Sequence, residues 1–296
     1  MHHKIPWLTI LAVFIWGCGA SKEDTTHTED CPPSSFAALK AFFQYDGSRS
    51  SPLIMAHRGG ASDGFPENCI PTFERTLAGV SCPLVEFDVR MTRDSQLVLL
   101  HDDELELCTD GSGLLSQTDW ADLQKLHLKD DSDQLTELTM PTFAEVLQWF
   151  ENKAAILIID AKPMTAPDLV LEAINQSKVK NQSVLICYSL ADAEYVYERT
   201  PDLMLALGFN NDELIAAIEQ SKIPKDQILA LTPRELQAEA YYQHIHQMGI
   251  SCSLGTNGNI DTLAVDASEA LYVERFQTGA DIICTDNPIE VAGIFK

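Results

Sequence analysis

Three side chains with catalytic potential lie at the ends of short apolar runs early in the chain. His57 follows the run 53–56 (LIMA), which is typical of a short buried strand. Glu86 and Asp88 lie two residues apart in the run 83–89, and the period of two in a strand points both carboxylates to the same face. We therefore expect one imidazole and two carboxylates to reach a common place.

A second histidine, His101, follows another apolar run, 96–100. Paired carboxylates can hold a hard divalent cation through oxygen, and histidines beside it can exchange protons near neutral pH. A lone histidine at a strand end is more often structural, and a lone pair of acids usually faces solvent. The conjunction of all four groups is far more specific than its parts and indicates a cation site with acid–base groups beside it.

The elements that must position these groups alternate along the chain. Apolar runs such as SVLICYS, LMLALGF and ADIICTD are each followed by a helical pattern, and eight such strand–helix units can be counted from residue 53 onward. Alternation of this kind predicts a parallel sheet, and eight units predict a closed TIM (β/α)8 barrel. Active-site residues should then lie at the C-terminal ends of the strands.

Composition sets outer bounds on function. With 296 residues, 45% hydrophobic and 22% charged, the chain is long and apolar enough for one globular α/β domain. The net charge of −24 argues against nucleic acid or an anionic membrane surface as a partner, because both would repel the protein. We expect a small-molecule substrate, and the oligomeric state stays open.

The N-terminus predicts export. Residues 1–17 have a basic start and a short apolar core, which is typical of a signal peptide. The residues before Cys18 are similar to a bacterial lipoprotein box, so we expect a periplasmic or cell-surface protein that is lipid-anchored through Cys18. Residues 18–50 are interpreted as an acidic tether with a lead-in helix, and 51–296 as the barrel with an insertion at about 103–140.

The cysteines fall into two groups, and their pairing stays open. Export permits disulfides, and four cysteines are expected in turn-like or exposed contexts: Cys31, Cys69, Cys82 and Cys108. Three others lie inside apolar runs and are interpreted as core residues: Cys187, Cys252 and Cys284.

Five short motifs carry a family resemblance. AHRGG, PEN, EFDV, LHDDELELCTDGSG and MPTFAEVL occur in this order, densely between residues 53 and 162, and GADIICTDNP follows near the C-terminus. The chain thereby resembles the glycerophosphodiester phosphodiesterase family. The resemblance implies a (β/α)8 barrel with a small insertion after the second strand. It also implies metal-dependent hydrolysis of glycerophosphodiesters to sn-glycerol 3-phosphate and an alcohol, with one Ca²⁺ or Mg²⁺ as the cofactor.

The resemblance also suggests a role for each candidate site residue. Catalytic acid–base roles fall to His57 and His101, metal binding to Glu86, Asp88 and Asp160, and substrate binding to Arg58, Glu67, Lys162 and Tyr188. Which histidine is the acid and which the base stays open. The family usually has Glu where Asp160 stands, and the seventh strand lacks the Trp that commonly walls the family's pocket; Tyr188 is a candidate for that wall.

Two rival functions remain at this stage. Asp160 and the expected lipid anchor favour a phospholipase D-like activity on lysophospholipid or sphingomyelin, whereas the PEN motif and the insertion count against it. A lipoprotein that binds phosphodiesters without hydrolysing them is a rival from another class. The presence of both histidines and all the carboxylates weighs against that rival.

Overall fold

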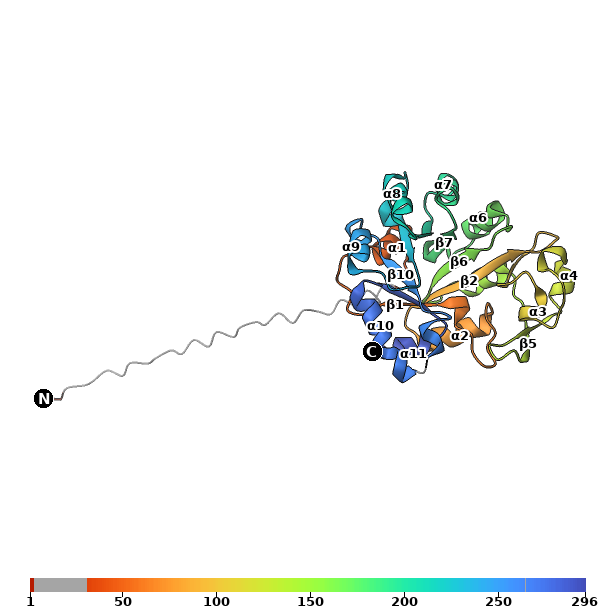
Figure 1. Ribbon diagram of the computed structural model, residues 1–296, viewed down its shortest axis with the longest axis horizontal. Helices are drawn as coiled ribbons and strands as arrows, with labels where there is room; N and C mark the ends of the chain where they lie inside the picture. Colours follow the sequence, from red (N-terminus) through yellow and green to blue (C-terminus); the bar gives the residue numbers. More distant parts are fainter. Residues whose placement is uncertain (3–30, 264) are drawn as a thin grey trace.

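The chain folds as a closed barrel of eight parallel strands with helices around it (Figure 1). The computed structural model describes residues 1–2, 31–263 and 265–296. Neighbouring strands follow chain order, and β1 pairs with both β2 and β11, which closes the cylinder. The barrel strands are β1 Leu53–Ala56, β2 Leu84–Met91, β6 Ile156–Ala161, β7 Ser183–Cys187, β8 Met204–Gly208, β9 Ile228–Thr232, β10 Cys252–Gly255 and β11 Ile282–Thr285. The predicted TIM barrel is confirmed.

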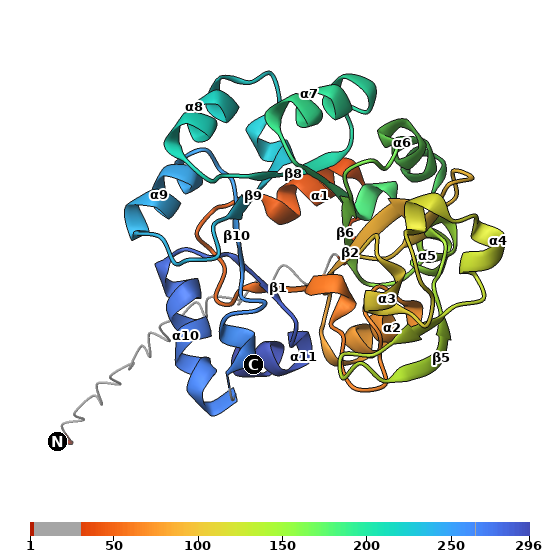
Figure 2. The ribbon, with the colours of Figure 1, turned by 45° about the vertical axis from the view of Figure 1, so that its right-hand side comes forward.

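The helices between these strands cover the outside of the barrel (Figure 2). They are α2 Ile70–Gly79, α5 Phe143–Trp149, α6 Pro167–Gln176, α7 Leu190–Arg199, α8 Asp212–Gln220, α9 Glu239–Gln247, α10 Val265–Thr278 and α11 Pro288–Ile294. The N-terminus of α5 is stabilised by a capping box, in which Thr142 and Glu145 each bind the other's backbone N–H. This box is visible in the sequence as Thr followed three positions later by Glu.

Side chains alternate between the two faces of each strand. On β2, Val85 and Phe87 point outward into the core between sheet and helices. Leu84 points inward, where it packs with Ile156 and Ile158 of β6 in the core of the cylinder. The period of two therefore places the next inward positions of both strands at the C-terminal mouth. Polar groups at these positions face one another there.

A helix that precedes the barrel closes the end formed by the N-termini of the barrel strands. Helix α1, Phe36–Phe43, coincides with the predicted lead-in helix and places Leu39, Phe42 and Phe43 in the inner core. A disulfide between Cys31 and Cys82 fastens the start of this segment to the loop before β2. The N-terminal end of the barrel is thus sealed, which leaves the C-terminal mouth for chemistry.

The insertion after β2 is a small unit with its own apolar core. It contains β3 Leu97–Leu99, α3 Leu105–Cys108, α4 Trp120–Leu123, β4 His127–Lys129 and β5 Leu135–Thr139. The sequence predicts a helix over 119–126, whereas α4 is shorter. The reason is a turn at its end, after which the N–H of His127 donates to Asp110 and starts a strand.

The cysteine environments differ in part from expectation. Cys69 and Cys108 are buried rather than exposed, because both pack in or beside the core of the insertion. Cys187 and Cys252 are buried as expected. The predicted signal peptide and Cys18 fall within residues 3–30, outside the described part of the chain. Among the described residues, no helix combines the length and apolar character needed to cross a bilayer.

Candidate active site

Three carboxylates converge at the C-terminal mouth of the barrel. Glu86 and Asp88 occupy consecutive inward positions of β2, and Asp160 lies opposite Asp88 on the neighbouring strand β6. One ligand oxygen from each lies within 4.8 Å of the others. Glu86 and Asp88 are buried, and the Asp160 side chain is 13% exposed. The cluster is therefore a compact set of oxygen donors of the kind that hard divalent cations bind.

The turn after β1 supplies one of the contacts that hold this cluster. His57–Gly59 forms a short 3₁₀ turn in which Arg58 adopts a left-handed φ of 49°. The turn aims the Arg58 N–H at Glu86, with a distance of 2.7 Å to Oε2. Gly59 has a φ of 87° and lies directly against the Phe73 ring, so a side chain at this position would clash.

The Arg58 side chain extends across the acidic cluster. Its Nη1 donates to Glu67 at 2.7 Å, and its Nε lies 3.9 Å from Asp88. That Nε is buried and makes no hydrogen bond among the described residues. The guanidinium is thus held between two acids, with Glu67 hydrogen-bonded to Nη1 and Asp88 on the side of Nε.

Two side chains bound to Asp160 form the opposite wall. Lys162 Nζ lies 2.6 Å from both Asp88 and Asp160, so it bridges the two strands. The Tyr188 hydroxyl donates to the other oxygen of Asp160 at 2.6 Å. Burial and the nearby carboxylate of Asp160 raise the pKa of Tyr188, which keeps the phenol protonated as a donor.

Electrostatics show that the acids outnumber their partners. Burial, and then the charge of Asp88, raise the pKa of Glu86 well above its ordinary value. Burial also works to raise the pKa of Asp88, but the ammonium of Lys162 and hydrogen bonds from Lys162 and Asn68 lower it overall. Three carboxylates share the Lys162 ammonium and one side of the Arg58 guanidinium, and the Glu86 carboxylate carries the remaining repulsion. A divalent cation would satisfy this donor set, so the residues present fit the implied metal.

His57 is fixed by two partners on the far side of the mouth. Its Nδ1 lies 2.7 Å from an Asp286 carboxylate oxygen, and its Nε2 lies 3.3 Å from the Asn257 amide nitrogen. A carboxylate at Nδ1 favours the tautomer with the proton there and leaves Nε2 as an acceptor. Asp286 is itself held by its backbone N–H, which donates to Asp261.

His101 follows β3 and lies on the insertion side of the mouth. Its Nδ1 is 3.1 Å from Asp102, and its backbone oxygen accepts a hydrogen bond from Arg90 Nε at 2.7 Å. The charge of His101 acts on Asp88 and lowers its pKa, after the larger effects of burial, Lys162 and Asn68. His101 therefore lies within electrostatic range of the carboxylate cluster, as the sequence predicts.

Three residues outside the predicted set organise the site, and of these sequence reasoning had considered only Asp286, as a loop cap or pocket residue. Asn68 donates to Asp88 at 2.8 Å and accepts from the Asp88 N–H, which locks this carboxylate in place. Asn257 and Asp286 hold His57 from opposite sides. All three carried a signal: Asn68 ends the PEN motif, and the other two lie just beyond the predicted seventh and eighth strands, where barrel sites are built.

Comparison with known proteins agrees with this geometry. The profile of the glycerophosphoryl diester phosphodiesterase family matches residues 57–270. The chain belongs to this family. A crystal structure of a glycerophosphoryl diester phosphodiesterase from Parabacteroides distasonis is 32% identical, covers 88% of this chain and 91% of its own, and superposes with a TM-score of 0.83. The prediction of a glycerophosphodiester phosphodiesterase is thereby confirmed.

Two further relatives of this chain extend the comparison. The glycerophosphodiester phosphodiesterase of Bacillus subtilis is 32% identical over 126 residues, which are 40% of this chain and 42% of that protein. An Oleispira antarctica phosphodiesterase was solved in complex with the product sn-glycerol-3-phosphate; it is 19% identical, with a TM-score of 0.68, covering 86% of this chain and 98% of its own. The similarity to the Oleispira structure shows that the two chains share a fold.

Proposed function

We propose that this protein hydrolyses glycerophosphodiesters to sn-glycerol 3-phosphate and an alcohol, with one Ca²⁺ or Mg²⁺ held by Glu86, Asp88 and Asp160. The observation that carries the proposal is the meeting of these three carboxylates at the barrel mouth, where His57 follows β1 and His101 follows β3. Family membership and the product found in the Oleispira relative support the substrate class. A cation bound there would draw negative charge from the phosphoryl oxygens as the bond breaks.

The basic residues of the site neutralise and orient the phosphate. The guanidinium of Arg58, held by Glu67 and close to Asp88, supplies one positive charge beside the phosphoryl oxygens. Lys162 supplies a second positive charge from the β6 side, next to Asp88 and Asp160. These two cations offset the repulsion that a chain of net charge −24 exerts on an anionic substrate.

The two histidines supply proton transfer. His57, with Nδ1 on Asp286, presents Nε2 as an acceptor and acts as the general base toward the glycerol hydroxyl that attacks phosphorus; the alcohol leaves, and water then opens the cyclic phosphate to glycerol 3-phosphate. His101, beside Asp102, acts as the general acid toward the leaving alcohol. General acid–base groups of this kind each contribute about 10² to 10⁴ in rate.

We further propose an exported protein that is lipid-anchored through Cys18. The signal-like residues 1–17 and the lipoprotein-like residues before Cys18 support this location. The disulfide between Cys31 and Cys82 supports it independently, because such bonds persist in oxidising compartments. Replacement of Cys18 by Ser should release the protein from membranes and abolish labelling by radioactive palmitate. Unchanged membrane retention would contradict the anchor.

The activity is tested by incubating the protein with glycerophosphocholine and measuring glycerol 3-phosphate, with and without chelator. We expect release that stops in chelator and returns with added Ca²⁺ or Mg²⁺. His57→Ala should lose at least about 10²-fold in rate. Turnover that is unaffected by this substitution would contradict the role of His57, and binding of glycerophosphocholine without any release of glycerol 3-phosphate would favour a phosphodiester-binding lipoprotein.

A further inference from the structure

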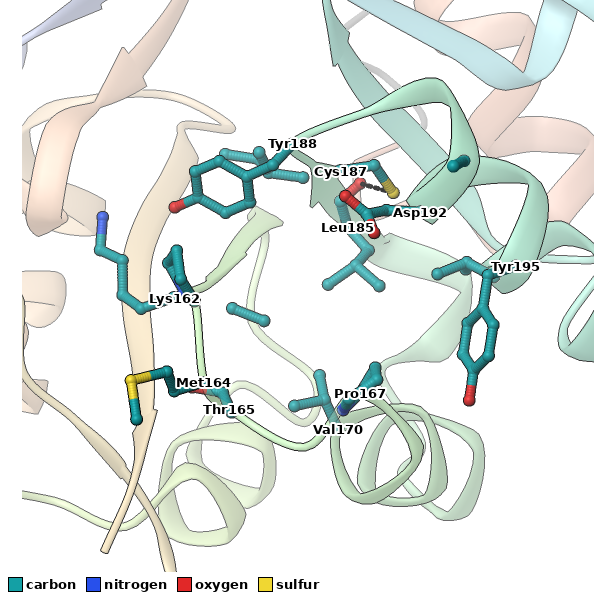
Figure 3. Close-up of a pocket in the computed structure, with 15 residues that line it drawn as sticks. Lys162, Met164, Thr165, Pro167, Val170, Leu185, Cys187, Tyr188, Asp192 and Tyr195 are labelled. Atoms are coloured by element: carbon teal, nitrogen blue, oxygen red, sulfur yellow. Dashed lines mark hydrogen bonds between the residues drawn. The ribbon is translucent and has the colours of Figure 1, made fainter. Parts of the chain in front are cut away.

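Next to the carboxylate cluster lies an apolar crevice between α6 and α7 (Figure 3). Its volume is about 560 Å³. The loop after β6 and the two helices form its sides, β7 forms its floor, and the side chains that make it apolar are Met164, Val170, Leu185, Ala191 and Val196. None of these five side chains has a place in the chemistry proposed above.

Two residues belong to both the crevice and the catalytic mouth. Tyr188 presents its ring to the crevice, and its hydroxyl donates to Asp160. Lys162 likewise presents its methylene stem to the crevice, and its ammonium binds Asp160. Figure 3 shows the hydroxyl end of Tyr188 and the amino end of Lys162 on the same side of the crevice. The crevice therefore lies directly beside the carboxylate cluster, and Tyr188 and Lys162 form the boundary that the two share.

The two flanks of the mouth differ in chemistry. On the β10 and β11 side, Asn257 and Asp286 offer hydrogen-bonding groups. On the β6 and β7 side, Met164 and Tyr188 are 86% and 56% exposed, which is high for large apolar side chains. Glycerol, with two free hydroxyls, suits the polar flank, whereas hydroxyls buried in the crevice would lose hydrogen bonds with water. The moiety on the other ester bond of the phosphate would then face the apolar flank.

We propose that the crevice binds the alcohol moiety of the substrate, and that this enzyme prefers glycerophosphodiesters whose alcohol is an apolar chain. The inference rests on the proposed function and specifies its substrate class. A fully buried methylene contributes about fourfold in affinity. If about half of each added methylene is buried, four extra methylenes should raise kcat/KM by roughly tenfold.

The test compares sn-glycero-3-phosphoethanol with sn-glycero-3-phosphohexanol, which are soluble and have leaving groups of similar basicity. We expect kcat/KM for glycerol 3-phosphate release to be about tenfold higher for the hexyl ester, mainly through KM. Ala191→Phe, which fills the crevice, should reduce this ratio toward one. The matched substitution Ala217→Phe on the exposed face of α8 should keep the wild-type ratio, and Met164→Ser provides a second lining variant if Ala191→Phe does not fold.

The outcomes separate the two proposals. Glycerol 3-phosphate release from neither ester would refute the proposed function itself. Equal kcat/KM for both esters would refute the crevice inference alone and leave the activity intact. A gain in rate from an acyl chain on the glycerol, with no gain along the alcohol series, would overturn the assignment of the crevice to the alcohol.

Discussion

Replacing Glu86 by Gln should stabilise the metal-free protein while destroying its metal site. The three carboxylates have ligand oxygens within 4.8 Å of one another. At an effective dielectric constant of about 20, two unit charges at that separation repel by about 3.5 kcal/mol. Glu86 faces Asp88 and Asp160, whereas Lys162 and the Arg58 guanidinium, which Glu67 also binds, attract it, so at most about one such repulsion is left uncompensated. Gln keeps an oxygen that can accept from the Arg58 N–H.

The expected gain is about 3 kcal/mol near pH 8, or a Tm increase of roughly 6 to 12 °C for a domain of this size. The gain in stability should increase as the pH rises. Burial, and then Asp88, raise the pKa of Glu86, so the folded state keeps this proton to higher pH than the unfolded chain does. The stability of the metal-free wild type should therefore fall as pH rises from about 4.3 through the raised pKa, and the cost is fully present above it.

The assay is thermal unfolding in chelator across this pH range, repeated with excess Ca²⁺. In chelator, the Tm of the Glu86→Gln protein should not show the fall with rising pH that is attributed to this residue. Added Ca²⁺ should raise the Tm of the wild type, which binds it, and should raise the Tm of the variant little. Glu74→Gln, on the exposed side of α2, removes the same charge as a control and should change Tm little. A metal-free Glu86→Gln protein less stable than wild type near pH 8 would refute the electrostatic reasoning.

The remaining predictions concern the partners of the site and the N-terminal fastening. Asp286→Asn should lower kcat by at least about 10²-fold with little change in KM, because it replaces the carboxylate by an amide that can also donate to Nδ1 and so no longer fixes the His57 tautomer; an unchanged kcat in steady-state assays would contradict this role. The double substitution Cys31→Ser and Cys82→Ser should lower the free energy of unfolding by about 2 to 4 kcal/mol in denaturant titrations and leave kcat unchanged. Equal stability with and without this bond would show that α1 closes the barrel without help.

Much of the fold follows from local sequence patterns. Apolar runs of four to eight residues alternate with helical patterns, and each predicted barrel strand is present. The face of each strand was also predictable, because Glu86 and Asp88 share a period of two with the inner core residue Leu84, while Phe87 joins the outer core. Patterns of this kind depend only on residues within one helix or strand, so they can be interpreted without knowledge of the tertiary contacts.

The parts that sequence reasoning missed depend on contacts between distant elements. His57 and Asp286 are 229 residues apart, and only closure of the barrel through the pairing of β1 with β11 brings them together. Cys31 and Cys82 are 51 residues apart, and their pairing required α1 to fold back under the barrel. The crevice between α6 and α7 depends on helix packing, for which no local motif exists.

The central claim is that one divalent cation, held by Glu86, Asp88 and Asp160, supports turnover. It is tested most directly by titrating Ca²⁺ or Mg²⁺ into metal-free protein while bound ion and glycerol 3-phosphate release are measured in the same samples. The account predicts that both signals rise together and saturate at one tightly bound ion per chain, with neither signal present in Asp88→Asn. Full turnover in chelator with no ion bound would contradict it.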